Sequence, residues 1–594
     1  FQVKGIKEVH FVIWTTTPWT IPSNVAVCIH EEIEYVLVRG GNANFIIARD
    51  LMDACSERWD LELEILGSVL GKDIKNITMK HPLYKRESKL LHGDHVTTES
   101  GTGCVHTAPA HGLDDYFICN KHGLESVKAL DNRGLFREEY GPLSGLSTKK
   151  GDPIVIELLE KNEALLASKP YDHSYPHCWR HKSPVIFMST PQWFISMKKS
   201  GLIDGAINAV TNVNWEPSWG EERILSMLED RPDWCISRQR NWGVPITLII
   251  HNETGEIHPK QNFLFNQIAD VIEEEGIEGW DNLELDTLID DAESYTKVHD
   301  TLDVWFDSGV THMCVLDKLY GADVIADLYL EGSDQHRGWF QSSLLTGIAT
   351  NGMAPYRSVL THGFVVDEEG RKQSKSLGNT ISPQKVWDTL GADILRLWIA
   401  STDFRSEMVA SDEIFKRVAD QYRRIRNTFR FLLGNISDFD ATSDSIELDN
   451  LLELDKWILS ELALLQEDIL GLYKSYSYHQ AMQRIHNFCV NQLGGIYLDI
   501  IKDRQYTTQK NSEIRRSAQT AMKIIIDQLV VLVSPVLSFT AEEIWQGTDF
   551  LLAEADSVFL ATLKTLKDFA SDLSSENWVR LLKIKDEVNQ VIED

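Results

Sequence analysis

The sequence has few cysteines for its length, and none of them is spaced as a pair. Eight cysteines are scattered through 594 residues, which excludes the dense cysteine framework of a small disulfide-stabilised protein. This usage favours a reducing compartment, so we expect the cytoplasm. Internal repeats of roughly 20 to 50 residues and low-complexity segments are also missing, which excludes repeat architectures.

Long apolar runs are missing as well. The most apolar stretch, residues 524–539, is interrupted by Asp527, Gln528, Ser534 and Pro535. It is therefore too short to cross a bilayer, and we expect a buried helix and no membrane partner. The first residue is Phe rather than Met, and neither a signal peptide nor a transit pattern follows it. We therefore expect an internal fragment of a longer chain.

Positive charge is scarce. The chain has 58 Lys and Arg against 89 Asp and Glu, a net charge of −31, which argues against a protein that coats nucleic acid. Any nucleic-acid contact must use a local basic face. One candidate lies within residues 416–430, where Arg423, Arg426 and Arg430 share one helix face. A solvated helix face bridged to nearby acids explains the same pattern equally well.

The composition, 43% hydrophobic and 25% charged, is that of a soluble globular protein with room for about four domains. Short β-branched runs broken by Gly, Asn and Thr predict a β-rich domain at residues 1–168. Residues 169–390 predict part of an α/β sheet, with an acidic helical insertion near 252–296. Within this region, the apolar runs 184–188 and 358–367 are candidate buried strands.

The remainder of the chain is predicted to be helical, with connecting helices at 391–440 and a bundle at 441–594. Ser382 and Pro383 are typical of a helix start just before this region. One buried stripe is predicted from apolar residues spaced i, i+4, i+7 and i+11, namely Ile458, Leu462, Leu465 and Ile469. Similar stripes continue to Val591.

Two segments carry the chemistry of a nucleotide site. Residues 371–379 read RKQSKSLGN and set Lys372 and Lys375 between an apolar strand and a helix. Ammonium groups and hydroxyls there can bind a triphosphate and stabilise the charge on departing pyrophosphate. Residues 330–340, LEGSDQHRGWF, set polar side chains directly after an apolar strand, where open α/β sheets bind ligands. Alone, a Lys/Ser-rich loop is usually just solvated.

Two further segments combine hydroxyls, imidazoles and carboxylates. Residues 14–20 read WTTTPWT, and residues 106–115 read HTAPAHGLDD. Such side chains can hold a small amino acid and orient a water molecule without offering a strong nucleophile. Taken singly, the threonines are explained as strand caps and His106 as a core histidine. The imidazoles and carboxylates can also be interpreted as metal ligands.

Together, these four segments resemble the isoleucyl-tRNA synthetases, class I enzymes that load isoleucine onto tRNA and hydrolyse wrongly loaded valine. Residues 371–379 resemble the Lys-Met-Ser-Lys-Ser signature, with Gln373 in place of Met. The resemblance implies a multi-domain α/β protein with a β-rich editing insert, a partial Rossmann-like class I catalytic fold, stem-contact-like helices and a C-terminal α-helical anticodon-binding bundle. It also implies tRNA(Ile), isoleucine and ATP with Mg²⁺ as substrates, and we expect a monomer.

The resemblance implies a role for each matched residue. The ATP and aminoacyl-adenylate site would comprise Glu331, Asp334, Gln335, His362, Gly363 and Lys375. Lys372 and Lys375 would be catalytic, and Trp305 and Trp339 would form the walls of the isoleucine pocket. The editing pocket, which would admit valine and exclude isoleucine, would comprise Thr15, Thr16, Thr17, Thr20, Asn24, His106 and Asp115. Asp115 would fix the α-amino group of the mischarged amino acid.

Two motifs are missing. No His-x-Gly-His sequence is present, so we expect that the fragment does not activate isoleucine by itself. The histidine-rich residues 177–181, with His251 and His258, include no CxxC pair, so we expect no zinc. Two alternative functions stay open, a stand-alone aminoacyl-tRNA deacylase and a non-catalytic tRNA-binding protein. The lysine loop beside Glu331 and Asp334 argues against a vestigial synthetic site.

Overall fold

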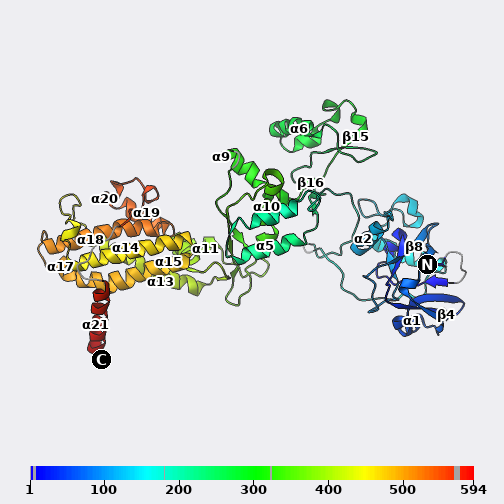
Figure 1. The fold of residues 1–594 in the computed structure, drawn as a ribbon, viewed down its shortest axis with the longest axis horizontal. Coiled ribbons are helices and arrows are strands. Elements are labelled where there is room, and N and C mark those ends of the chain that lie inside the picture. Colours follow the sequence, from blue (N-terminus) through cyan, green and yellow to red (C-terminus); the bar gives the residue numbers. More distant parts are fainter. Residues whose placement is uncertain (1, 4–8, 179–180, 322–323, 567–574, 594) are drawn as a thin grey trace. The chain divides into compact units, whose positions relative to one another are not determined.

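The computed structural model describes most of the chain and divides into two compact units, Phe1–Gln192 and Trp193–Asp594. Each unit is considered by itself (Figure 1). The described residues are 2–3, 9–178, 181–321, 324–566 and 575–593.

Unit 1 is built on a nine-stranded mixed sheet in the order β6-β4-β5-β2-β1-β7-β8-β3-β9. β2 pairs with β5 and β3 with β8 in parallel, and the other neighbours are antiparallel. The strands are β1 (Gln2–Val3), β2 (Val9–Phe11), β3 (Ala26–Ile29), β4 (Glu34–Gly40), β5 (Ala43–Ala48), β6 (Glu64–Leu70), β7 (Thr78–Lys80), β8 (Glu87–His92) and β9 (Val105–Thr107). The β-rich region expected from the sequence is therefore present.

In the described part of unit 1, three α-helices accompany this sheet, α1 (Met52–Trp59), α2 (Leu113–Lys121) and α3 (Thr148–Lys161). A 3-10 helix, η1 (Pro18–Ser23), follows the threonine run and contacts α3. The apolar run 184–188 was expected to be a strand, and that prediction is wrong. It forms no strand and Phe187 is 59% exposed, while Ile186 and Met188 pack against a core that includes Trp19. An apolar run alone does not distinguish a strand from a packed extended segment.

Unit 2 contains a three-stranded parallel sheet in the order β11-β18-β17. The strands are β11 (Asn214–Glu216), β17 (Tyr329–Gly332) and β18 (Ser358–His362). The helices α4 (Leu202–Val210), α5 (Trp219–Glu229) and α10 (Trp339–Asn351) share a buried core with Trp215 and Tyr329. The run 358–367 was expected to be a strand and supplies β18 and then β19 (Val365–Val366), which pairs with β20 (Met408–Val409).

The acidic stretch between β11 and β17 contains α6 (Gln261–Glu275) and α7 (Glu278–Asn282), packed around the buried Trp280. The remaining elements here are short pieces: β10 (Phe194–Ile195), β12 (Trp234–Cys235), β13 (Ser237–Arg238), β14 (Ile249–His251), β15 (Tyr295–Lys297), β16 (Thr301–Leu302), α8 (Val304–Gly309), a π-helical turn (His312–Asp317) and α9 (Lys318–Tyr320).

The C-terminal part is a helical bundle, visible in Figure 1 as the long helices α13, α14, α15 and α18. Its elements are α11 (Pro383–Leu390), α12 (Ala392–Ser401), α13 (Asp412–Asn435), α14 (Glu453–Lys474), α15 (Tyr478–Asn487), a π-helical segment (Phe488–Tyr497), α16 (Leu498–Ile500), α17 (Lys502–Tyr506), α18 (Glu513–Val533), α19 (Ser538–Gln546), α20 (Asp549–Leu552) and α21 (Ser575–Glu593). The helix start at Pro383, with Ser382 before it, is as predicted.

The predicted stripe on α14 is confirmed, because Ile458, Leu462 and Ile469 are fully buried and Leu465 is 7% exposed. The expectation that such stripes continue to the end of the chain is wrong for α21, where Val591 is 77% exposed. None of the helices described is long and apolar enough to cross a membrane. The predicted fold class, mixed α/β with a sheet-rich start and a helical end, is confirmed.

Candidate functional sites

The first site forms where η1 and β9 meet in unit 1, and it centres on His106. Because β9 pairs with β3, His106 lies opposite Val27 in the sheet and its side chain is 9% exposed. Its Nε2 lies 2.9 Å from the Thr20 hydroxyl, and its Nδ1 lies 2.9 Å from the Asn24 amide nitrogen. Thr20 and Asn24, which lie 86 and 82 positions before His106 in the chain, thus share one hydrogen-bond network with it.

The surrounding bonds fix the protonation of the His106 ring. The Asn24 amide also donates to the Ala26 carbonyl at 2.7 Å, so its second hydrogen is free to point at Nδ1, which accepts. The Thr20 hydroxyl donates to the Thr17 carbonyl at 2.8 Å, so it accepts from the Nε2–H. Burial lowers the pKa of His106 to about 3. The ring is therefore neutral, and both nitrogens are engaged.

The threonines ahead of η1 join this network unequally. The Thr15 hydroxyl accepts from the Thr17 amide at 3.0 Å and lies 3.3 Å from the Thr17 hydroxyl. Through the Thr17 carbonyl, both residues connect to Thr20 and thus to His106. Thr16 is exposed. Sequence reasoning grouped the three threonines, but the structure connects two of them to the histidine and turns the third toward solvent.

Asp115 lies in the first turn of α2 and approaches the site from another direction. Its Oδ2 accepts a 2.8 Å hydrogen bond from the Ala108 amide, two residues after His106. Burial raises the pKa of Asp115, and the bond from Ala108 opposes that rise. The carboxylate is thus held beside the backbone that leaves β9. A cationic partner beside a half-buried carboxylate of this kind favours its charged form.

Three contacts of His111 at this site were not predicted from the sequence. The Nε2 of His111 lies 2.9 Å from the Ser23 hydroxyl, and its Nδ1 lies 3.0 Å from the Phe187 carbonyl. Its ring also meets Trp19 edge-on, with ring centroids 4.8 Å apart. His111 thus ties η1 to the segment 184–188. The sequence offered only the proximity of His111 to His106 as a signal.

The second site forms at the carboxyl ends of β17 and β18 in unit 2. The register pairs Glu331 with Thr361 and Gly332 with His362. Because these strands are parallel, their carboxyl ends meet at one edge, where α/β sheets bind ligands. Oε1 of Glu331 lies 3.7 Å from Nε2 of His362 and accepts from the Gly332 amide at 3.0 Å.

Gly332 allows several side chains to converge at this edge. A Cβ atom on Gly332 would lie within 4 Å of Asp334, His362 and Phe364. Gly363 faces a similar constraint, because a Cβ atom there would lie 2.1 Å from the Ser406 carbonyl oxygen. The two glycines thus permit close approach of neighbouring atoms.

Gln335 and the two tryptophans lie beside that edge. The Gln335 amide donates to Asp334 at 3.1 Å, and its Oε1 accepts from the Trp339 amide at 3.0 Å. The Trp339 indole donates to the Ser308 carbonyl of α8 at 3.0 Å. On the same helix, Trp305 abuts Gly338, where an added Cβ would lie 2.8 Å from the indole. The two tryptophans are thus brought to neighbouring positions.

Asp303, before α8, anchors the Trp305 helix and was not assigned a role from the sequence. It accepts from the Trp234 indole at 3.2 Å and forms an ion pair with Arg238 at 3.2 Å. Arg238 lies in β13, which pairs with β16 just ahead of Asp303. Through this contact, the segment that begins with Arg238 supports the helix that carries Trp305.

The lysine-rich loop is organised by Asp367, a residue that sequence reasoning missed. Asp367 accepts from the Arg371 amide and guanidinium at 2.8 and 2.9 Å, and from the Asn379 side chain at 2.8 Å. The bond from Asn379, with further hydrogen bonds and the Arg371 charge, holds the pKa of Asp367 below its usual value. Asn379 also accepts from the Ser374 amide at 3.0 Å, so both ends of the loop are held together.

The lysines and Gln373 of this loop face different ways. The Lys372 ammonium lies 3.5 Å from the centroid of the Phe364 ring, a cation–π contact, and Lys375 is exposed. Gln373 is half-buried and accepts from the Ile381 amide at 3.2 Å. The residue that replaces Met in the signature therefore supports the loop from inside.

The basic face expected on α13 is partly neutralised. Arg423 pairs with Asp420, and Arg426 forms two bonds to Glu543, at 2.7 and 2.9 Å. For these two arginines, the alternative of a helix face bridged to nearby acids holds. Arg430 is exposed.

Within the part of the chain that the structure describes, no group of three or more His, Cys, Asp or Glu side chains is placed to hold a metal ion. In the histidine-rich segment, Cys178 Sγ lies 3.4 Å from Nδ1 of His181. Trp179 and Arg180 of that segment lie outside the described residues. The expectation of no zinc stays a prediction.

Comparison with known proteins assigns both halves of the chain. Residues 4–411 match the tRNA synthetases class I (I, L, M and V), and residues 455–594 match the anticodon-binding domain of tRNA ligase. Isoleucine–tRNA ligases of Teredinibacter turnerae and Saccharophagus degradans are each 50% identical, over 100% of this chain and 64% of their own length. A solved LeuRS ternary complex with tRNA and LeuAMS, from Agrobacterium radiobacter, is 15% identical over 96% of this chain and 69% of its own, with a TM-score of 0.44.

The chain thus spans less than two thirds of the length of these curated relatives. The class I match covers the sheet edge with Glu331 and His362 as well as the lysine loop, and it includes the His106 network. The second match covers most of the helical bundle. The chain therefore belongs to the class I tRNA synthetases of the isoleucine, leucine, methionine and valine group.

Proposed function

We propose that this chain is part of an isoleucine–tRNA ligase, which activates isoleucine with ATP, transfers it to tRNA(Ile) and hydrolyses mischarged Val-tRNA(Ile). The relatives named isoleucine–tRNA ligase, 50% identical along the whole chain, support this assignment. The single structural observation that carries it is the pair of separate polar sites, at the β17–β18 edge and around His106. One enzyme that selects an amino acid twice needs two such sites.

In the proposed synthetic site, the carboxylate of Glu331 holds the α-amino group of isoleucine. Asp334, Gln335, His362 and Gly363 contact the ribose and the adenine ring. Convergence of Asp334 and His362 beside Gly332 supports this role. Trp305 and Trp339 enclose the branched side chain, which they bury without leaving polar groups unpaired.

Lys372 and Lys375 act on the triphosphate. Two ammonium groups on one loop can stabilise charge on pyrophosphate as it leaves, and Mg²⁺ would enter with ATP. Because Lys372 lies over the Phe364 ring, it must leave that ring to reach a phosphate. The Lys372 side chain therefore changes its position when ATP binds.

In the proposed editing pocket, Asp115 binds the α-amino group of the mischarged amino acid. Its Oδ2 accepts from Ala108, which leaves Oδ1 for the ammonium group. Thr15, Thr17 and Thr20 shape the chamber beside His106, and the exposed Thr16 contributes from the solvent side. Oδ1 of Asn24 is buried and has no hydrogen-bond partner among the described residues, so a ligand or a water molecule can donate to it.

His106 is a positioning residue in this pocket. Its Nδ1 already accepts from Asn24 and its Nε2–H already donates to Thr20, so the ring holds no free lone pair with which to take a proton from water. Hydrolysis would then depend on positioning of the ester and of water.

The domain boundaries predicted from the sequence, after residues 168, 390 and 440, remain part of this proposal. So do the cytoplasmic location and the monomeric state. The free state of the described cysteines supports a reducing compartment.

Deacylation by the full chain tests the proposal. We expect hydrolysis of Val-tRNA(Ile) to be at least about tenfold faster than hydrolysis of Ile-tRNA(Ile), because one methylene in a pocket changes binding by about 1–3 kcal/mol. Equal rates for the two esters, or no hydrolysis of either, would contradict the editing role.

A further inference from the structure

Arg86 lies just before β8 and belongs to none of the motifs that carry the family resemblance, yet its side chain holds the end of η1. Its Nε donates to the Asn24 carbonyl at 3.1 Å, and its Nη2 donates to the Pro22 carbonyl. These two carbonyls flank Ser23, and all three residues are buried. One planar guanidinium, more than 60 positions away in the chain, thus fixes the backbone on both sides of Ser23.

η1 cannot satisfy these carbonyls by itself. The last carbonyls of a helix have no amide of the same helix to accept from, and a buried carbonyl without a partner is costly. The Ile21 carbonyl accepts from the Asn24 amide and from Nε2 of His81, each at 2.9 Å. The carbonyls of Pro22 and Asn24 accept from Arg86. The turn between β7 and β8 therefore supplies two side chains, His81 and Arg86, that complete the end of η1.

Asn24 is the residue through which this support reaches the proposed editing pocket. Its amide nitrogen lies 2.9 Å from Nδ1 of His106, and its Oδ1 is buried without a hydrogen-bond partner among the described residues. Thr20, which lies 2.9 Å from Nε2 of His106, is part of the same η1. A shift of the Asn24 backbone would move these contacts with it. The Arg86 guanidinium therefore acts on the pocket through Asn24.

A chamber that separates valine from isoleucine has to be stiff, because the two side chains differ by one methylene. The groups of such a site must be held to within about 0.5 Å by the side chains packed behind them. We propose that Arg86 determines the specificity of the editing pocket as a positioning residue, by holding Asn24 and η1 against His106. The inference rests on the proposed function, since it concerns the amino acid that the editing pocket accepts.

Arg86→Lys in the full chain tests the proposal. Lysine keeps the positive charge but replaces the planar fork with a single ammonium group on a shorter stem, so the geometry of the two bonds is lost. We expect the preference for Val-tRNA(Ile) over Ile-tRNA(Ile) in deacylation to fall about threefold to tenfold, because the released wall admits the larger side chain. Hydrolysis of Ile-tRNA(Ile) should become faster in absolute terms, which a loss of stability alone would not produce.

A double variant tests the route through Asn24. Asn24→Ala alone should lower the preference for Val-tRNA(Ile), because it removes the side chain that Arg86 positions. Adding Arg86→Lys to Asn24→Ala should then change the preference by less than about a factor of two, since two residues that act through one contact do not give additive effects. Fully additive effects of the two substitutions would overturn the proposal.

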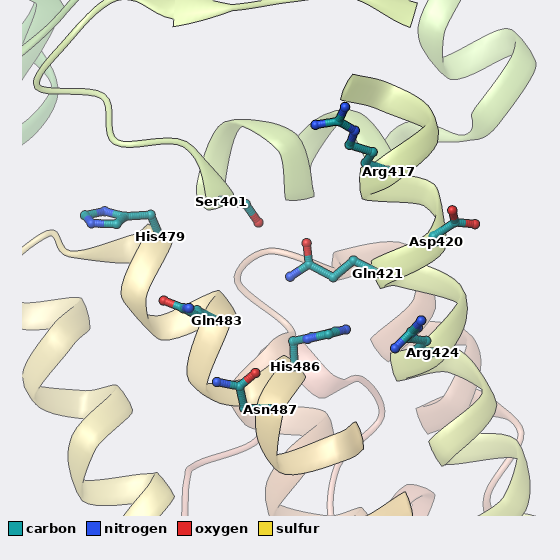
Figure 2. A pocket seen from close by; sticks show the side chains of 9 residues that line it. All are labelled: Ser401, Arg417, Asp420, Gln421, Arg424, His479, Gln483, His486 and Asn487. Atoms are coloured by element: carbon teal, nitrogen blue, oxygen red, sulfur yellow. The ribbon is translucent and has the colours of Figure 1, made fainter. Parts of the chain in front are cut away.

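Two other arginines offer matched controls. Arg39 on β4 is largely exposed and pairs with Glu64 at 3.8 Å. In unit 2, Arg424 lines a cavity of about 620 Å³, where Figure 2 shows it on α13. Arg39→Lys and Arg424→Lys make the same chemical change without touching η1, so both should keep the wild-type preference. If Arg86→Lys keeps it as well, or if its two deacylation rates fall in proportion, Arg86 does not determine specificity.

Hydrogen exchange distinguishes failure of this inference from failure of the proposed function. The Thr20 amide donates to the Thr17 carbonyl at 3.0 Å and the Asn24 amide donates to the Ile21 carbonyl at 2.9 Å, so both amides report local opening of η1 without any tRNA. If the wild-type chain hydrolyses neither ester, the proposed editing function fails. Faster exchange of these amides in Arg86→Lys than in Arg39→Lys still supports the positioning role, and equal exchange overturns it.

Discussion

Gly332 leaves no room for a side chain beside Asp334, because a Cβ atom there would lie 2.9 Å from Oδ1 of the aspartate. For Gly332→Ala we expect displacement of Asp334 and about tenfold weaker binding of a non-hydrolysable isoleucyl-adenylate analogue, or about 1.4 kcal/mol. Calorimetric titration measures this. Gly434→Ala on α13, where an added Cβ meets no atom within 4 Å, is the control and binds like the wild type. Equal affinities for Gly332→Ala and the control would remove the ribose role of Asp334.

Asp115 is expected to act through its charge. Asp115→Asn keeps an oxygen for the Ala108 amide but loses the attraction for an ammonium group, so the two functions separate. We expect the rate of Val-tRNA(Ile) deacylation to fall about tenfold to a hundredfold, the range for a hydrogen bond to a charged group. Asp115→Ala loses the backbone bond as well and should be the less stable of the two variants. Undiminished hydrolysis by Asp115→Asn would show that Asp115 is not the anchor.

The pH dependence of deacylation follows from the side chains of Asp115 and His106. The pKa of Asp115 is raised by burial, so the carboxylate loses its charge at a higher pH than an exposed aspartate, and the rate should decline as the pH falls toward that value. His106, with a pKa of about 3, should contribute no inflection between pH 5 and 8. A rate profile with a midpoint near 6.5 that disappears in His106→Asn would restore the histidine as a general base.

His81 and His106 make unit 1 sensitive to acid. Burial lowers the pKa of each to about 3, against 6.5 when unfolded. Between these values, unfolding takes up a proton per histidine. The free energy of unfolding therefore falls as the pH falls, by at most about 1.4 kcal/mol per pH unit for each residue. Denaturant unfolding at pH 7, 6 and 5 measures the slope.

His81→Gln should reduce the slope of the free energy of unfolding against pH by the contribution of one proton. Substitution of the exposed His122 by Gln should leave the slope unchanged. A free energy of unfolding that is constant from pH 7 to 5 in the wild type would contradict both pKa shifts.

Local patterns in the sequence predicted the elements that depend on near neighbours. The stripe from Ile458 to Ile469 is buried on α14 because helical spacing alone places these side chains on one face. The segment around Glu331 lies at a strand end because an apolar run followed by Gly and Ser terminates a strand. The family resemblance identified residues 14–20 and 106–115 as parts of one site. It did not reveal that Thr16 is exposed while Thr15 and Thr17 join the histidine network.

The sequence by itself determined the buried stripe of α14, the strand β18 and the segments that carry polar chemistry, since that information lies within a few residues of each position. Only the tertiary structure decided which groups are charged and which are paired. Glu543 lies 117 residues from Arg426 and neutralises it. His106 is neutral because folding removes it from water and surrounds it with Thr20 and Asn24. Desolvation and long-range pairing depend on atoms that no local spacing brings together.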